Sequence, residues 1–272
     1  MRGHSQKRLK QALYRLAARL PPGLRRRLGA SPATRALRDR FFRPGGEPEL
    51  VSDTISWMDL RFPFTAPYQV LEKARARGVE NRICRLARSL LGPGDLAVDV
   101  GANYGFVTMV AAHSVAPGGR VISFEIEPRI CRALRGSIDA AGLADTVRLV
   151  ERGAGAVDEE GNEGDAGAGL VRVDTVLDGL DLERFRFLKV DVDGLDLDVL
   201  RGAAESLRRA KPTVVIEMTR DGAEIYALLR ELGYSRFMDQ DNRAFEPDGP
   251  DGPWPENLIA SDAPVRIPDR SP

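Results

Sequence analysis

The stretch Leu96-Ala-Val-Asp-Val-Gly-Ala-Asn-Tyr-Gly105 places a short apolar run directly before a glycine-containing turn. A run of this length that ends at turn residues predicts a buried strand over residues 96–100. Gly101 permits the sharp turn that follows, and Gly105 permits close packing of the next helix on the strand. Strand, glycine loop and helix in this order are typical of the first unit of a doubly wound α/β fold, whose ligands bind beyond the carboxyl ends of the strands.

Apolar runs alternate with segments of helical periodicity along the rest of the chain. The expected strands cover residues 96–100, 121–125, 147–151, 187–192, 213–218 and 257–260. The expected helices cover residues 68–91, 105–115, 128–141, 195–210 and 222–232. This alternation predicts a mostly parallel sheet with helices on both faces, which is a doubly wound, Rossmann-like α/β fold. Residues 153–169, rich in Gly, Ala, Asp and Glu, are expected to form a surface loop.

Charge divides the chain into two parts. Residues 1–50 contain 13 Lys and Arg against 3 Asp and Glu, or +10, so the remainder carries 27 against 37, or −10. We therefore expect residues 1–49 to form a basic helical extension, residues 50–262 the main domain, and residues 263–272 a tail. The extension either packs on the main domain or contacts an anionic membrane surface or a partner.

The composition narrows the class of protein. Hydrophobic residues make up 43% of the chain, which indicates a globular protein, and an acidic main domain argues against a nucleic-acid binder. Cys84 and Cys131 lack metal-type spacing and fit a reducing cytoplasm. The chain contains no apolar run of 18 residues and no signal-peptide pattern, so a cytoplasmic protein is expected.

The residues around the glycine loop favour one class of cofactor. A carboxylate at Asp99 suits the ammonium group of S-adenosylmethionine, whereas it would repel the pyrophosphate of a dinucleotide. Asn103 stands where the dinucleotide pattern G-x-G-x-x-G has its second glycine. Glu125 follows Gly101 by 24 residues, near the usual offset of an acid that binds ribose hydroxyls. These features favour S-adenosylmethionine, and an NAD-dependent oxidoreductase remains the alternative.

A second group of acids follows the strand at residues 187–192. Strand alternation places Lys189, Asp191 and Asp193 on one side, where Asp191 would touch the methionine part of the cofactor or the incoming nucleophile. Glu217 ends the next strand and faces the same crevice. Asp191 and Glu217 are therefore the candidate proton acceptors. The grouped carboxylates are also candidate ligands for Mg²⁺, although no second ligand set is visible.

Several blocks of sequence, taken in order, resemble the FkbM-type methyltransferases. They are Gly78-Val-Glu80, Pro93-Gly-Asp95, Asp99-Val-Gly-Ala-Asn-Tyr-Gly105, Phe124-Glu125 with Pro128, Asp174-Thr-Val-Leu-Asp178, and Leu188-Lys-Val-Asp-Val-Asp-Gly194 with Val199-Leu-Arg-Gly202. The resemblance covers about residues 55–260 and implies a class I methyltransferase fold.

The resemblance also implies an activity. Members of this family transfer a methyl group from S-adenosylmethionine to a hydroxyl of a sugar, glycolipid, polysaccharide precursor or natural product. The resemblance implies that the cofactor site has Asp191 beside it and is lined by Asp99, Gly101, Asn103, Gly105 and Glu125. A non-catalytic cofactor-binding module in a biosynthetic assembly is a further alternative.

Overall fold

The computed structural model describes residues 50–160, 169–192, 194–218, 221–249 and 252–269. These residues belong to one compact unit, Leu50–Pro272. The expected basic extension at residues 1–49 and its membrane contact lie outside the described residues, as does Asp193. Within the described ranges, no helix combines the length and apolar character needed to cross a membrane.

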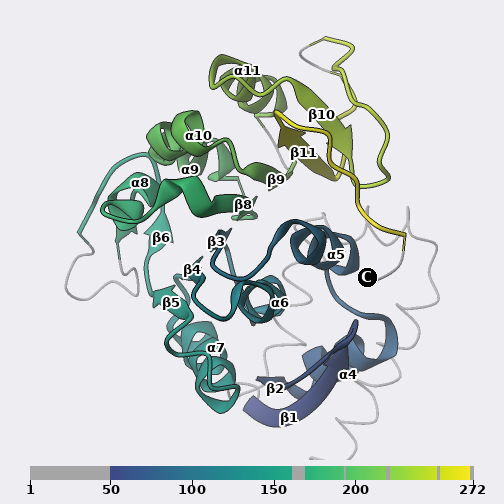
Figure 1. Ribbon diagram of the computed structural model, residues 1–272, viewed down its shortest axis with the longest axis vertical. Coiled ribbons are helices and arrows are strands. Elements are labelled where there is room, and N and C mark those ends of the chain that lie inside the picture. The colour runs from purple at the N-terminus through teal and green to yellow at the C-terminus, as the bar shows by residue number, and fades with distance from the viewer. Residues whose placement is uncertain (1–49, 161–168, 193, 219–220, 250–251, 270–272) are drawn as a thin grey trace, which may run out of the picture. The chain divides into compact units, whose positions relative to one another are not determined.

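A seven-stranded sheet forms the centre of this unit (Figure 1). In spatial order its strands are β10 (Arg236–Asp239), β11 (Asn257–Ser261), β9 (Thr213–Glu217), β8 (Phe185–Val190), β3 (Leu96–Val100), β4 (Arg120–Phe124) and β5 (Val147–Val150). The five strands from β9 to β5 are parallel, and β11 pairs antiparallel with both β9 and β10. The chain builds outward from β3 to β5 and then returns to β8 and β9, so the strand order reverses between β3 and β8. This topology confirms the doubly wound, Rossmann-like prediction.

Helices cover both faces of the sheet. They are α4 (Tyr68–Arg77), α5 (Asn81–Leu90), α6 (Phe106–Val115), α7 (Pro128–Ala140), α8 (Val173–Leu177), α9 (Asp196–Gly202), α10 (Ala204–Ala210) and α11 (Gly222–Glu231), with a 3₁₀ turn η1 (Leu182–Arg184). In Figure 1, α5, α6 and α7 lie on one face and α8 to α11 on the other. Ala97 packs with the first group and Val98 with the second, so both faces of β3 are buried, which explains why four of its five residues are apolar.

A hairpin that the sequence did not predict packs outside α6 and α7. It consists of β1 (Leu50–Trp57) and β2 (Leu60–Pro67) in antiparallel pairing. Phe62 and Phe64 are buried, and the ring centroid of Phe64 lies 4.4 Å from that of Phe106. The hairpin therefore completes the hydrophobic core on this side of the sheet.

Two predicted helices are each divided in the structure. The helix expected over residues 68–91 is α4 and α5, and the chain turns between them at Gly78, whose φ is 76°. A Cβ at Gly78 would lie 2.3 Å from the Trp57 ring, so this close turn requires glycine. The helix expected over residues 195–210 is α9 and α10, which are separated at Ala203. In the predicted loop at residues 153–169, β6 (Gly153–Ala154) pairs in parallel with β7 (Leu170–Val171).

Asp174 joins two of the helices on the second face. Its carboxylate accepts hydrogen bonds from the backbone N–H groups of Glu205 at 3.1 Å and Ser206 at 2.9 Å, in the first turn of α10. Arg172 donates to the same carboxylate at 3.1 Å. The buried side chain thus satisfies N–H groups that have no partner within their own helix.

We expect Asp174→Ala to lower the free energy of unfolding by about 1–3 kcal/mol, because two backbone donors at the start of α10 lose their buried acceptor. Asp178→Ala is the matched control, since Asp178 belongs to the same sequence block but is exposed, and it should change stability by about 0.5 kcal/mol or less. Urea denaturation followed by circular dichroism measures both. Equal effects of the two substitutions would contradict the capping role of Asp174.

Candidate functional site

A cavity of about 400 Å³ lies at the carboxyl ends of β3 and β4, and we call it the loop cavity. Its lining includes Gly101, Asn103, Phe124, Glu125, Arg152 and Asp191. It therefore brings together four of the residues predicted to bind a cofactor, at the place where the strand order reverses.

Gly101 lies close to the backbone that follows β8. Its φ is 75°, and its N–H donates to the carbonyl oxygen of Phe124 at 3.1 Å. A Cβ at this position would lie 1.9 Å from the backbone oxygen of Asp191. Asn103 also has a positive φ, 51°, which allows the loop to turn a second time before α6. The loop conformation thus requires the residue types that the sequence has.

Glu125 holds the glycine loop against the end of β4. One carboxylate oxygen accepts from the backbone N–H of Asn103 at 2.8 Å, and the other accepts from those of Ile126 and Glu127 at 2.9 Å each. These bonds fix the carboxylate at the cavity wall, and the oxygen that accepts only from Asn103 keeps a further lone pair. A contact between Glu125 and a ribose remains a prediction.

Gly105 has a structural role at the end of the loop. It precedes α6 with a φ of 92°, and a Cβ here would lie 2.3 Å from Cδ1 of Leu134 in α7. α6 packs against β3 as expected, but the neighbour that leaves no room for a Cβ at Gly105 is α7 and not the strand. Gly105 is not among the residues that line the loop cavity.

A second cavity, of about 450 Å³, opens at the ends of β8, β9 and β10, and we call it the acidic cavity. Its lining includes Glu80, Arg82, Lys189, Asp191, Glu217 and Asp241. Asp191 lines both this cavity and the loop cavity. A group held beside Asp191 is thus accessible from the two sides.

Lys189 lies almost completely buried between the glycine loop and the acidic cavity. Its ammonium nitrogen is 3.1 Å from a carboxylate oxygen of Asp191, 3.4 Å from the carbonyl oxygen of Gly101, and 3.7 Å from carboxylate oxygens of Asp99 and Glu80. Burial alone would lower the pKa of Lys189, but the surrounding carboxylates outweigh it and raise that pKa. Lys189 therefore stays charged and ties β8 to the glycine loop.

Asp99 lies behind the loop. It is 1% exposed, and one carboxylate oxygen accepts from the Thr108 hydroxyl at 2.6 Å. It lines neither the loop cavity nor the acidic cavity, and a direct contact with a cofactor ammonium remains a prediction. What the structure shows is that Asp99 faces the Lys189 ammonium.

Asp191 and Glu217 come together as the sequence predicted. Burial alone would raise the pKa of Asp191, but the charge of Lys189 and a side-chain hydrogen bond with Glu217 lower it below its ordinary value. An ionised carboxylate only accepts hydrogen bonds, so Glu217 is the donor of this pair when Asp191 is ionised. The two acids thus form a hydrogen-bonded pair on the wall of the acidic cavity.

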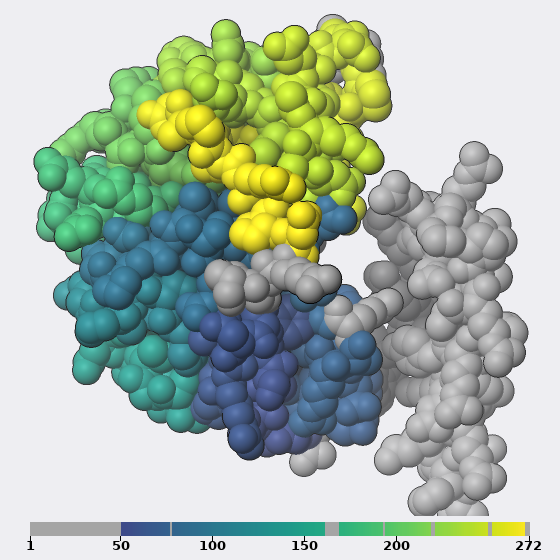
Figure 2. All heavy atoms as spheres, turned by 45° about the vertical axis from the view of Figure 1, so that its right-hand side comes forward, coloured from purple at the N-terminus to yellow at the C-terminus, as the bar shows by residue number. Residues whose placement is uncertain are grey.

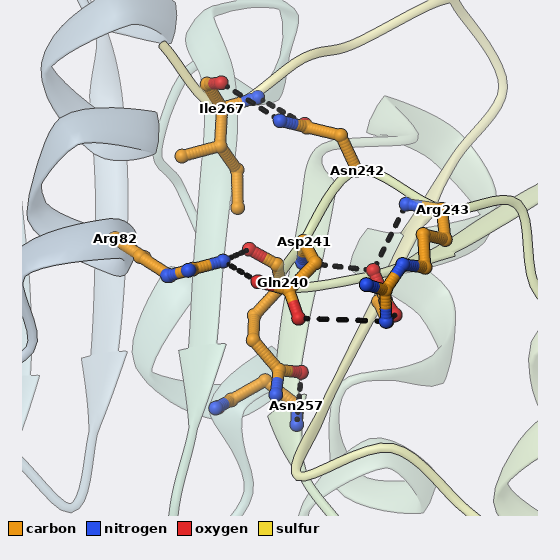
Figure 3. Close-up of polar contacts among 8 residues, drawn as sticks. Arg82, Gln240, Asp241, Asn242, Arg243, Asn257 and Ile267 are labelled. Atoms are coloured by element: carbon orange, nitrogen blue, oxygen red, sulfur yellow. Dashed lines mark hydrogen bonds and ion pairs between the residues drawn. The ribbon is translucent and has the colours of Figure 1, made fainter. Parts of the chain in front are cut away.

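Arg82 and the connection after β10 form the outer wall of the acidic cavity (Figure 3). The Arg82 guanidinium donates to the Gln240 carbonyl oxygen at 2.5 Å and to the Asp241 carboxylate. The Gln240 side chain accepts from the N–H of Asn257 at 3.1 Å. These residues were missed in the sequence, where the region after Asp239 shows only a Pro- and Asp-rich composition.

Asn242 ties this wall to the C-terminal segment. Its side chain accepts from the N–H of Ile267 at 2.7 Å and donates to the carbonyl oxygen of Ile267 at 3.0 Å. Figure 2 shows the last described residues, in yellow, lying along the surface toward the blue residues near the start of this unit. Ile267 is buried in the same hydrophobic cluster as Ile83. The C-terminal segment thus supports the cavity wall.

The expectation of Mg²⁺ ligands finds no support. Within the described part of the chain, no group of three or more His, Cys, Asp or Glu side chains has the arrangement to hold a metal ion. The ammonium of Lys189 already supplies a positive charge among Asp99, Asp191 and Glu80. Asp193 lies outside the described residues.

The chain is similar to one family and to several solved structures. A family model described as the methyltransferase FkbM domain matches residues 99–236. No curated protein matches the chain. An FkbM methyltransferase from Methylobacillus flagellatus KT is 17% identical over 64% of this chain, with a TM-score of 0.44, and the match spans 49% of that protein's length.

Two other solved structures are similar over a larger share of their own length. A SAM-dependent O-methyltransferase from Thermotoga maritima is 16% identical, with 85% of this chain and 82% of that chain covered and a TM-score of 0.46. A putative methyltransferase from Streptococcus mutans in complex with SAH is 14% identical, with 66% and 94% covered and a TM-score of 0.42.

We expect Gly101→Ala to destabilise the protein more than Gly94→Ala. Both glycines have positive φ, so each substitution should cost about 1–2 kcal/mol of unfolding free energy from backbone strain. Only Gly101 lacks room for a Cβ, because the Asp191 backbone oxygen is 1.9 Å away, whereas no atom lies within 4 Å at Gly94. The additional cost at Gly101 should be about 1–3 kcal/mol by urea denaturation. Equal losses of unfolding free energy in the two variants would show that the loop can shift to make room for a Cβ at position 101.

We expect Lys189→Met to lower the free energy of unfolding by about 3–5 kcal/mol at pH 7, since it leaves buried carboxylates without their cation. The pKa of Lys189 is raised, so its contribution is complete below the ordinary lysine pKa of about 10.4 and is lost only as pH rises through the folded-state value. Lys73→Met is the exposed control, with an expected change of about 0.5 kcal/mol or less. Guanidinium denaturation measures the free energy of unfolding of both variants. Similar small losses of stability in the two would contradict the role of Lys189.

Proposed function

Because the chain belongs to the FkbM methyltransferase family, we propose that it transfers the methyl group of S-adenosylmethionine to a hydroxyl oxygen of a sugar, a glycolipid or polysaccharide, or a natural product. Its sheet is that of the Rossmann-like class I methyltransferase fold. The observation that carries the proposal is the position of Asp191 on the walls of both cavities. Cofactor and acceptor in separate cavities would meet beside this carboxylate.

The loop cavity fits the cofactor. The positive φ of Gly101 lets the loop turn beside the cavity, and Glu125 presents an oriented carboxylate for the ribose hydroxyls. Phe124 and Ile126 add apolar surface suited to a purine ring. S-adenosylmethionine supplies a methyl group that is already activated on a sulfonium, so the residues of this chain have to position and desolvate the reactants. On this proposal Asn103 lines the cofactor site with them, and Asp99 and Gly105 support the loop.

The acidic cavity suits an acceptor with hydroxyl groups. Its walls are rich in hydrogen-bond acceptors, including the carboxylates of Glu217, Asp241 and Glu256. The charge of Arg82 is already paired with Asp241, and that of Lys189 with Asp191. A neutral molecule that donates hydroxyl protons is therefore a better occupant than an anion such as a nucleic acid.

The proton of the acceptor hydroxyl needs a base. Asp191 stays ionised at neutral pH because its pKa is lowered, so it is available to take that proton. Glu217, through its hydrogen bond to Asp191, orients this carboxylate and can relay the proton. Membership in a methyltransferase family favours this reaction over hydride transfer with NAD, the alternative considered from the sequence.

We expect Asp191→Asn to lower methyl transfer by about 10²- to 10⁴-fold, the usual contribution of a general base. Glu217→Gln should lower it less, because the amide still donates to Asp191. Since the pKa of Asp191 lies below its ordinary value, turnover of the wild type should fall with acidification only below about pH 4. Asp198→Asn is the control, as Asp198 pairs with Arg201 on the surface of α9.

The measurement uses methyl-labelled S-adenosylmethionine with a panel of sugar and natural-product hydroxyl acceptors, each paired with its amine analogue. S-adenosylhomocysteine binding is measured in parallel by calorimetry. Label found only on the amines would contradict O-methylation. Full turnover of both Asp191→Asn and Glu217→Gln with intact binding would contradict their role in proton transfer, and cofactor binding without methylation of any acceptor would indicate a non-catalytic module.

A further inference from the structure

Hydrogen-bond donors are fewer than acceptors around the Lys189 ammonium. It has three N–H groups, and four oxygens surround it. Only the oxygens of Asp191 and Gly101 lie within hydrogen-bond distance. Among the described residues, the enclosed oxygens Oε2 of Glu80 and Oδ1 of Asp99 have no hydrogen-bond partner. Buried carboxylate oxygens without donors are unfavourable, so a ligand that brings a donor to one of them would be stabilised.

The two unpartnered oxygens differ in their access to a ligand. The Asp99 side chain is 1% exposed and lines neither cavity. The Glu80 side chain lines the acidic cavity and keeps 27% of its surface exposed, although its Oε2 atom is enclosed. A ligand group in the acidic cavity can therefore meet the Glu80 side chain, whereas neither cavity leads to Asp99.

The local backbone holds Glu80 in this position. Glu80 has a left-handed conformation, with φ 51° and ψ 32°, at the start of α5, and its carbonyl oxygen accepts the first helical hydrogen bond from Cys84 at 2.9 Å. The turn at Gly78 that leads into it is packed against Trp57. A non-glycine residue in this conformation is strained, and such residues persist where the surrounding structure requires them.

The charges around Glu80 favour a cation. The carboxylates of Glu80, Asp99 and Asp191 surround the single ammonium of Lys189, so negative charge is in excess when all are ionised. Burial raises the pKa of Glu80, the charge of Lys189 opposes this, and Asp99 and Asp191 add to it. A bound cation with N–H donors would compensate this charge and satisfy the free oxygen of Glu80.

We propose that Glu80 accepts the α-ammonium group of the methionine portion of S-adenosylmethionine. This group carries a positive charge, which would balance the excess of carboxylates over the single Lys189 ammonium, and N–H donors, one of which could meet the Glu80 carboxylate. Lys189 links Glu80 to the carbonyl oxygen of Gly101, so Glu80 lies across from the loop that lines the cofactor cavity. Asp99, for which the sequence predicts an ammonium contact, faces the Lys189 ammonium. The proposal concerns the cofactor only and holds for any methyl acceptor.

The test compares two ligands by titration calorimetry on the full chain without an acceptor. S-adenosylhomocysteine contains the ammonium group, whereas 5′-methylthioadenosine has the same nucleoside without the amino-acid portion. Glu80→Gln should weaken S-adenosylhomocysteine about 10- to 100-fold, the usual effect of losing a hydrogen bond between charged groups. It should change 5′-methylthioadenosine by about threefold or less.

Glu256→Gln is the matched control, because Glu256 lines the same cavity. It should change S-adenosylhomocysteine binding by about threefold or less, and a loss equal to that of Glu80→Gln would overturn the proposal in favour of diffuse attraction. Equal weakening of both ligands by Glu80→Gln would also overturn it. So would unchanged binding with lost turnover, which would place Glu80 on the acceptor.

A second variant covers the case in which Glu80→Gln does not fold, as judged by circular dichroism. Glu80→Asp keeps the negative charge and withdraws the carboxylate by one methylene. It should weaken S-adenosylhomocysteine while leaving 5′-methylthioadenosine unchanged. If this contrast between the two ligands is absent, the ammonium contact does not exist.

Discussion

The ammonium of Lys189, buried between β3 and β8, is the interaction on which the site depends. Asp191, Asp99 and Glu80 come from three different parts of the chain, and without a cation between them their charges would repel one another in a region of low dielectric constant. The same ammonium donates to the carbonyl oxygen of Gly101 and so couples the shape of the glycine loop to the carboxylates. The Lys189 side chain thus both offsets the charge of the carboxylates and fixes the position of the glycine loop.

The topology of the sheet explains why two cavities meet at this place. Between β3 and β8 the connections leave in opposite directions, so neither covers the carboxyl end of the sheet. The loop cavity occupies one side of this gap and the acidic cavity the other, with Asp191 between them. On the proposed function, the glycine loop and Glu125 hold the nucleoside part of the cofactor on one side of Asp191, and Glu217, Asp241 and Glu256 face the acceptor on the other. Asp191, which directly follows β8, lines both cavities and so connects the two sets of residues.

The parallel strands and the glycine loop were predictable because their signals are local. Four of the five residues of β3 are apolar because both faces of the strand are buried, and the turn after it is marked in the sequence by Gly101, whose φ is 75°. The division at Gly78 was not predictable, because it depends on packing against Trp57 from the unpredicted hairpin. Arg82 and Asp241 lie 159 positions apart, and no local pattern indicates that they pair. The position of Glu80 beside Lys189 follows from the same long-range packing.

The wall that contains Arg82 and Asp241 is attached to the antiparallel edge of the sheet, away from β3 and β4. Asn242 fastens this wall to Ile267 with two hydrogen bonds that do not involve the glycine loop. Insertions and substitutions after β10 can therefore accumulate during evolution without disturbing the loop around Gly101. On the proposed function, the acceptor could therefore change while the cofactor loop is kept, because the connection after β10 and the glycine loop are carried by opposite halves of one sheet.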